Sequence, residues 1–280
     1  LDKRDQLQSQ IDSWHRANTS GFEFADYKGF LQEIGYLVAE GGEFSVSPEN
    51  VDTEIAKQAG PQLVVPIMNA RFALNAVNAR WGSLYDALYG NDVISEQEGA
   101  EKAGAYNAVR GQKVIDYGRD FLDGAAPLSN GSHHQATRYS VMAGQLMIAL
   151  EDGTSASLQA PDQLSGYLGD AGNPSSILIK NNNLHLELQV DCNHIIGQSD
   201  KAGVKDIVLE SALTTIMDCE DSVAAVDADD KALAYGNWLG LIKGTLKETI
   251  IRGDSSFVRS MNPDRTYTAP DGSDLTLNGR

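Results

Sequence analysis

The sequence is short of cysteine and of long apolar runs. Cys192 and Cys219 are the only two cysteines among 280 residues, too few for a disulfide framework and typical of a reducing compartment. No apolar run approaches the length that crosses a bilayer. These two absences argue against a disulfide-stapled secreted domain and a helical membrane protein, and we expect a cytoplasmic protein that does not bind membranes.

Basic residues are also scarce. Against 39 Asp and Glu there are 22 Lys and Arg, which gives a formal net charge of −17. An acidic surface repels a phosphate backbone, so we expect no nucleic-acid partner. A small anionic substrate is not excluded, because a few local arginines can hold one. The sequence also lacks a glycine-rich phosphate loop, a G-x-S-x-G motif and a C-x-x-C motif.

Two stretches have the strand–turn–helix pattern of an α/β fold. In the first, residues 63–65 are a short apolar run ended by proline, and apolar residues at helical spacing predict a helix from about residue 70 to 90. In the second, strand-like residues 206–213 lead into the apolar residues 215–217. A long helical region is then predicted from Ser222 onwards.

Between these two stretches the pattern is that of antiparallel hairpins. Residues 139–150 and 154–158, joined by a turn, predict one hairpin, and residues 177–180 and 184–190, joined by three asparagines, predict another. In residues 184–190 apolar and polar side chains alternate, which predicts one solvated face. Hairpins between two α/β stretches indicate an inserted domain.

Two amphipathic helices, over residues 2–16 and 26–37, open the sequence. They are too short to enclose a core, so we expect them to rest on a larger body. The sequence starts at Leu1 within a helical pattern and stops at Arg280 just after a strand-like stretch. We therefore expect a piece of a longer chain.

The most unusual stretch places Asp218, Glu220 and Asp221 directly after an apolar strand. Carboxylates this close repel one another, so a cation, several hydrogen-bond donors or a substrate should compensate them. The carboxyl ends of parallel strands are where α/β proteins hold ligands, and acidic residues there often hold a divalent cation. The alternative that stays open is that Asp221 and Ser222 cap the next helix.

The other polar motifs favour structural roles. Arg71 follows a strand end at a helix start, where it could receive an anion, but a solvated arginine is the more frequent case. Residues 227–230 lack the glycine and the later glutamate of a calcium loop and fit an acidic helix start. His133 and His134 are adjacent and point apart, and nothing next to His185 completes a metal site.

Two long stretches, residues 59–90 and 215–231, resemble malate synthase, specifically the long bacterial G isoform. Residues 177–190, 237–246 and 257–268 support the resemblance, which runs in order over essentially the whole chain. It implies condensation of acetyl-CoA with glyoxylate and water to malate and CoA, in the glyoxylate bypass.

The resemblance also implies a fold: α/β, with the first strands of a (β/α)8 TIM barrel that is incomplete in this chain, an N-terminal helical clasp, and an inserted α/β domain containing β-hairpins. We expect a monomer in the full-length form. The implied domain limits are 1–60 for the clasp and linker, 61–80 for the first barrel strand and helix, 81–213 for the insert, 214–243 for the second barrel strand and helix, and 244–280 for the return of the insert.

By the same resemblance, the acetyl-CoA contacts fall on Val64, Arg71, Phe72, Ser222 and Arg259. The two arginines suit the phosphates of CoA, which need cationic donors.

Asp218 and Glu220 would lie near a Mg²⁺ ion, holding metal-bound water or an active-site arginine, with the direct metal ligands outside this chain. The family's catalytic arginine and aspartate fall beyond Arg280, so we expect no turnover from this chain alone. Two alternatives remain: an inactive fragment of that enzyme, and a related Mg²⁺-dependent acyl-CoA lyase of the citrate-lyase-like class.

Overall fold

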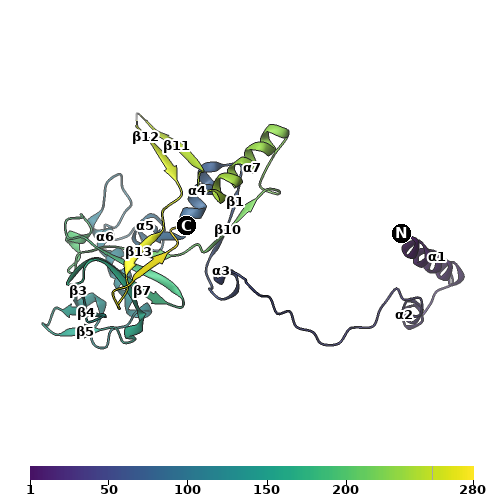
Figure 1. Ribbon diagram of the computed structural model, residues 1–280, viewed down its shortest axis with the longest axis horizontal. Helices are drawn as coiled ribbons and strands as arrows, with labels where there is room; N and C mark the ends of the chain where they lie inside the picture. Colours follow the sequence, from purple (N-terminus) through teal and green to yellow (C-terminus); the bar gives the residue numbers. More distant parts are fainter. Residues whose placement is uncertain (254) are drawn as a thin grey trace. The chain divides into compact units, whose positions relative to one another are not determined.

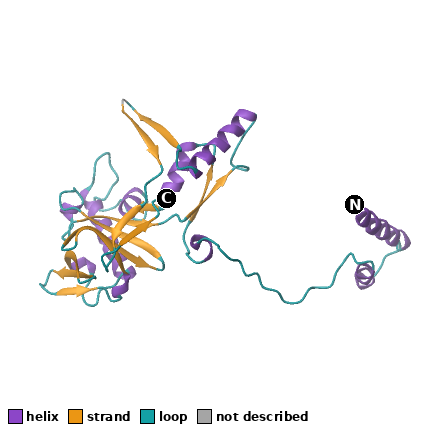
Figure 2. Ribbon diagram, in the orientation of Figure 1, coloured by secondary structure: helices purple, strands orange, loops and turns teal. Residues whose placement is uncertain are grey.

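The computed structural model describes residues 1–253 and 255–280, and Figure 1 shows its helices and strands. The chain divides into two compact units, Leu1–Asn50 and Val51–Arg280. The second unit is mixed α/β, with strands in one parallel and several antiparallel sheets (Figure 2). Among the described residues no helix is both long and apolar enough to cross a membrane.

The first unit is a pair of helices joined by aromatic contacts. α1 (Asp2–Ala17) agrees with the sequence prediction within a residue, whereas α2 (Phe24–Glu33) ends earlier than predicted. The backbone leaves the helix at Gly35, whose φ of 74° is favourable only for glycine. The Trp14 ring lies 4.7 to 5.5 Å from three ring centroids, those of Phe22, Tyr27 and Phe30. Aromatic packing therefore joins the two helices, although Leu31 is the only buried helix residue.

The second unit begins with a short helix, α3 (Thr53–Ala56), and then a parallel pair of strands. β1 (Gln62–Pro66) lies parallel to β10 (Thr214–Asp218), and the helices α4 (Ala70–Asn78) and α7 (Ala228–Ile242) follow the two strands. A small core joins the helices to the strand ends; its buried members are Ile67, Ala73, Leu74, Ala234 and Leu241. Two strand–helix units thus share one core although about 150 residues separate them.

The predicted helix over residues 70–90 is wrong in its middle. α4 ends at Asn78, Trp81–Ser83 form strand β2, and α5 (Leu84–Gly90) starts anew with the Ser83 hydroxyl accepting from the Asp86 amide at 2.9 Å. β2 pairs antiparallel with β9 (Val204–Glu210). The backbone hydrogen bonds of this distant strand outweigh the helical spacing of the side chains, because spacing alone cannot report a long-range ladder.

A seven-stranded sheet forms the larger body of the second unit, in the order β14-β13-β6-β7-β8-β9-β2, with every neighbouring pair antiparallel. The bounds of its other strands are β6 (Leu164–Asp170), β7 (Asn173–Asn181), β8 (Leu184–Val190), β13 (Arg265–Thr268) and β14 (Asp274–Leu277). The predicted hairpin over residues 177–190 is confirmed as β7 and β8, and its turn uses Asn182 and Asn183 with positive φ.

A three-stranded sheet and a long helix pack with the larger sheet. The predicted single strand over residues 139–150 is wrong: β3 (Ala136–Met142) turns at Ala143 and Gly144 into β4 (Gln145–Leu150), which pairs with β5 (Ser155–Ser157). Ala143 and Gly144 have φ of 49° and 75°, the two-residue turn of a tight hairpin. Ala-Gly lacks the usual asparagine or aspartate of this turn, so local residues do not predict it.

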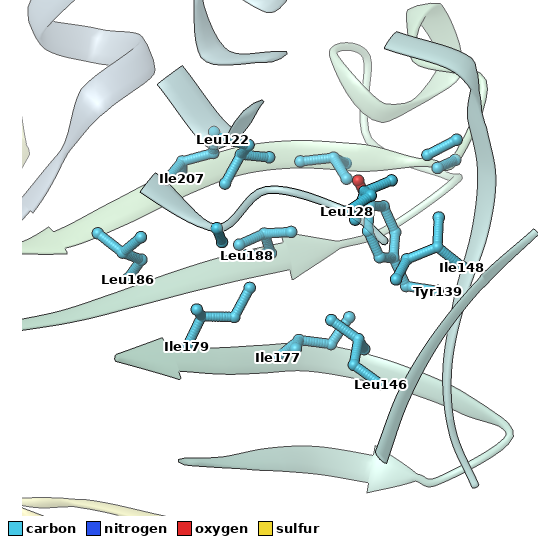
Figure 3. Close-up of a cluster of buried hydrophobic side chains, with 14 of the residues drawn as sticks. Leu122, Leu128, Tyr139, Leu146, Ile148, Ile177, Ile179, Leu186, Leu188 and Ile207 are labelled. Carbon is cyan, nitrogen blue, oxygen red and sulfur yellow. The ribbon is translucent and has the colours of Figure 1, made fainter. Parts of the chain in front are cut away.

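The main core lies between these sheets and α6 (Ala108–Ala125), as Figure 3 shows. Its members with no exposed surface include Leu122, Ile148, Ile177, Ile179, Leu188, Val204 and Ile207. The remaining short elements are the 3-10 turns His133–Gln135, Pro161–Gln163 and Gly197–Ser199, and the hairpin of β11 (Lys247–Arg252) and β12 (Ser255–Ser260).

The expected solvated face of β8 is covered at its centre, whereas His185 and Gln189 on the same face stay partly exposed. Glu187 is only 3% exposed, and it accepts hydrogen bonds from Ser176 and from Tyr267, each at 2.8 Å. Arg265 lies 2.6 Å from the same carboxylate and 4.5 Å over the Trp81 ring. Apolar and polar side chains therefore do alternate along β8, but Arg265 and Tyr267 of β13 bury Glu187 on the polar side.

His133 belongs to a buried polar chain that joins α6 to β3. Its Nδ1 lies 2.9 Å from the Tyr139 hydroxyl, and its Nε2 lies 2.8 Å from the Ala126 carbonyl oxygen. The carbonyl can only accept, so Nε2 carries the proton and Nδ1 accepts from the hydroxyl, while Arg119 donates to that hydroxyl at 2.7 Å. Burial lowers the pKa of His133, and the nearby Arg119 lowers it further. The ring is neutral in the folded protein.

This burial predicts a loss of stability on mild acidification. The unfolded chain binds a proton at His133 below about pH 6.5, whereas the folded protein resists it, so stability falls as pH drops below that value. We expect His133 to lower the free energy of unfolding by about 1 kcal/mol for each pH unit below that value. Urea unfolding at about pH 7.5 and about pH 5.5 measures this change in the free energy of unfolding. The proteins compared are the wild type, His133→Gln, and His134→Gln as the exposed control. Equal slopes in all three would contradict the prediction.

Candidate functional site

The carboxyl ends of β1 and β10 meet at one edge of the parallel pair (Figure 1). Pro66 lies opposite Asp218 in the register, and the Ile67 amide donates to the Asp218 carbonyl oxygen at 3.1 Å. Val64 and Ile216 are cross-strand neighbours, 63% and 46% exposed. The edge therefore brings the acidic cluster next to the start of α4.

Arg71 and Phe72 stand in the first turn of α4. The Asn69 side chain caps this helix by accepting from the Phe72 amide at 3.0 Å. Arg71 is exposed and Phe72 is 49% exposed. The cap fixes where the helix starts, so both side chains leave the helix at the edge where β1 ends.

Arg71 lines a hollow between α4, α7 and β11. Asn237, buried on α7, donates from its amide to the carbonyl oxygens of Ile67 at 3.0 Å and Met68 at 3.1 Å, and so fixes α7 against the end of β1. The other polar side chains that line the hollow are Asn69, Lys247 and Glu248. Two cations and one carboxylate face this hollow, which gives a locally positive surface on an acidic chain.

Arg259 reaches α4 from the hairpin. Its guanidinium donates to the Asn75 side-chain oxygen and lies 5.8 Å from the centroid of the Phe257 ring. Asn75 is one turn beyond Arg71 in α4, so the two residues share a helix face. The structure thus brings both predicted arginines to the same side of α4, although nearly 190 residues separate them in sequence.

Within the acidic cluster, the Asp218 carboxylate is compensated by hydrogen-bond donors of its own turn. One oxygen of Asp218 accepts from the Ser222 amide at 2.8 Å and from the Ser222 hydroxyl at 2.5 Å, and the other accepts from the Glu220 amide at 2.9 Å. The Ser222 hydroxyl, followed by these amides, lowers the pKa of Asp218. For Asp218, hydrogen-bond donors in the same turn therefore offset the repulsion between carboxylates that the sequence indicates.

The long helix does not start at Ser222, and the alternative of a cap there is also wrong. α7 starts at Ala228, where the Asp227 side chain accepts from the Asp230 amide at 3.0 Å. Residues 218–222 instead form a turn around Asp218, because its carboxylate attracts the free amides that would otherwise begin a helix. Throughout residues 1–253 and 255–280, no group of three or more His, Cys, Asp or Glu is placed to hold a metal ion.

Sequence reasoning missed Asn75, Asn237 and Lys247. Asn237 could have been singled out from the sequence, because a polar residue inside an otherwise apolar helical run needs a hydrogen-bond partner when it is buried. Asn75 and Lys247 had none, since their place beside Arg71 depends on contacts between distant elements.

Two strand–helix units with a mostly antiparallel domain between them define an α/β protein with an inserted domain. Residues 106–181 match the family described as malate synthase G, alpha-beta insertion domain. The whole chain is 56% identical to malate synthase G of Halalkalibacterium halodurans and 53% identical to those of Corynebacterium efficiens and Corynebacterium glutamicum.

The chain spans about 38% of the length of these curated relatives. The identity extends over 100% of this chain, so it includes the parallel strand pair, the hollow beside α4 and the inserted domain alike. The resemblance to malate synthase G read from the sequence is thereby confirmed.

Proposed function

We propose that this chain is part of a malate synthase G and supplies acetyl-CoA contacts for the condensation with glyoxylate and water that yields malate and CoA. The observation that carries the proposal is the identity of 53–56% over the whole chain to proteins of that name. Every one of these relatives is a malate synthase G, which favours this activity over an acyl-CoA lyase. Few cysteines are typical of a reducing compartment, so we place the protein in the cytoplasm. The resemblance implies a monomer in the full-length form.

The strand pair supports a barrel as the site of this chemistry. β1–α4 and β10–α7 would be the first two units of the (β/α)8 barrel, with the inserted domain between them and residues 1–60 as clasp and linker. A two-stranded parallel sheet is seldom stable alone, and the exposed Ile216 leaves apolar surface for neighbouring elements. Further strands of the full-length protein would cover it.

The hollow beside α4 would receive the CoA portion of the substrate. Arg71 is exposed beside Lys247, and Arg259 lies on the same side of α4, so cationic donors are available for phosphate groups. Val64 and Phe72 add exposed apolar surface for the less polar parts of acetyl-CoA. Ser222, held by Asp218, would stand at the acetyl end next to the strand edge.

Mg²⁺ is the metal that this family implies, and the described residues do not form its site. Both oxygens of Asp218 already accept hydrogen bonds within their turn, and no group of three metal-binding side chains is found among the residues that the structure describes. In our proposal Asp218 and Glu220 shape the edge near the metal, whose direct ligands come from the rest of the full-length protein. The chain by itself would not catalyse the condensation.

The test compares the chain alone with a full-length malate synthase G that carries this sequence. CoA release from acetyl-CoA and glyoxylate with Mg²⁺ should occur only in the full-length protein. There, Arg71→Ala should raise KM for acetyl-CoA about tenfold with little change in kcat, because it removes one charge-assisted contact to substrate. Arg138→Ala, an exposed arginine on β3 whose guanidinium bonds the Gly172 carbonyl oxygen, is the matched control. An unchanged KM in Arg71→Ala would count against the assigned contact.

A further inference from the structure

A cleft of about 400 Å³ opens in the inserted domain between α5, the start of α6 and the strands β8 and β9. Its size is that of a site for a small organic molecule. The proposed acetyl-CoA contacts of this chain do not line it. Its walls combine three tyrosines with two aspartates, one lysine and one histidine.

The aromatic wall is formed by Tyr89 and Tyr106 with Tyr85 beside them. The rings of Tyr89 and Tyr106 stack, with centroids 5.7 Å apart and planes 17° from parallel. The Tyr89 hydroxyl accepts from the Asn107 amide at 2.7 Å, and Tyr85 is 6% exposed. This wall offers a flat apolar surface to a flat ligand group.

The wall is held rigid from behind by Arg110. This residue is completely buried, and its guanidinium donates to the carbonyl oxygens of Tyr89, Asn91 and Ile94, each at 2.8 Å. Arg110 therefore ties the end of α5, the helix that carries Tyr85 and Tyr89, to the segment that follows it and leads to Tyr106. Such preorganisation lowers the entropy cost of binding.

The charged groups of the cleft leave an excess of negative charge. Lys205 also lines the cleft, and its ammonium pairs at 3.5 Å with Asp191, which is not part of the lining. Asp86 and Asp206 have no ion pair among the described residues. Burial raises the pKa of Asp206, and the neighbouring Asp86 raises it further. A positive ligand charge would relieve this repulsion.

From the tyrosine wall and the two unpaired carboxylates, we propose that this cleft binds a small organic cation with a flat group, such as an aromatic amine or an amidine. The flat group would lie against Tyr106, and the cationic group would face Asp86 and Asp206. An aromatic wall and carboxylates together select a cation over a neutral molecule of the same shape.

Three probes of one shape and different charge test the proposal: benzamidine, benzamide and benzoate. Titration of the isotope-labelled chain, followed by amide chemical shifts, should place benzamidine among the residues that line the cleft. We expect benzamidine to bind at least about fivefold tighter than benzamide, and benzoate weaker than both. Asp86→Asn should remove most of the preference for benzamidine without changing benzamide, whereas Asp92→Asn, an exposed aspartate outside the cleft, should change neither.

A second variant separates the wall from the charge. Tyr106→Ala should weaken the binding of benzamidine and of benzamide alike, and Tyr117→Ala, at an exposed tyrosine on α6 outside the cleft, should weaken neither. Thermal unfolding of each variant shows whether it is folded before it is titrated. Equal affinity for benzamidine and benzamide, shifts located elsewhere, or no binding up to about 10 mM would each overturn the proposal.

Discussion

Replacing Arg110 by alanine should lower the free energy of unfolding by about 4 kcal/mol. Arg110 is fully buried and makes no ion pair among the described residues; its charge is surrounded by carbonyl oxygens and by the Tyr89 ring, whose centroid lies 5.4 Å from the guanidinium carbon. Two of these, those of Leu88 and Tyr89, belong to the last turn of α5, where carbonyls lack helical partners and the helix dipole is negative. The substitution would leave several buried carbonyls without donors and open a cavity among them.

The conservative variant Arg110→Lys should restore only part of this loss, because one ammonium cannot reach carbonyl oxygens that a planar guanidinium contacts from three nitrogens. Urea unfolding at neutral pH, followed by circular dichroism, measures both variants. Arg138→Ala, with its guanidinium on the surface, serves as the control and should cost little. A loss below about 1 kcal/mol for Arg110→Ala would show that the loop carbonyls find other donors or water.

Asp200→Ala should cost about 3–5 kcal/mol, because it leaves the buried Arg119 charge without its partner. One oxygen of Asp200 pairs with the Arg119 guanidinium, and the other accepts from the amides of Ala202 and Val204, both at 2.9 Å. Two backbone donors would lose their acceptor as well. Tyr139 also bonds Arg119, but it cannot supply the missing negative charge, since burial raises its pKa to about 12.

A double-mutant cycle isolates the ion pair. Arg119→Met together with Asp200→Ala should cost clearly less than the sum of the two single variants, because the double variant leaves no unpaired charge. Lys201 and Glu151, 2.6 Å apart but 58% and 46% exposed, form the matched surface pair. Lys201→Ala should cost less than about 1 kcal/mol. Simple additivity at Arg119 and Asp200 would contradict the expected coupling.

How far the candidate site could be predicted is shown by Arg71 and Arg259. The resemblance to malate synthase assigned both to one ligand, but their common place on α4 depends on Asn75, which the resemblance did not single out. Asp218 shows the reverse case: the sequence marked it as a compensated charge, and the structure identifies the compensation as the amides and hydroxyl of its own turn. Hydrogen bonds to the backbone leave no mark in composition or spacing.

Local pattern determined the elements whose partners are close in sequence. The hairpin of β7 and β8 and the helix α1 were predictable, because side-chain alternation, turn residues and helical spacing act within a few residues. The same holds for the α/β class and for the acidic, cysteine-poor character that excludes whole classes of protein.

Only the tertiary structure decided the features that depend on distant segments. Trp81 is part of a strand because β9, some 130 residues later, supplies its hydrogen-bond partners. Glu187, on the polar face of β8, is buried because Tyr267 of β13 lies over it. Nothing in the local sequence marks Arg110 and Arg119 as buried, yet both are buried, since the carbonyls and the carboxylate that satisfy them come from other elements. The physical reason is the same in each case: burial and long-range hydrogen bonds depend on which surfaces meet, and a local sequence window does not contain that information.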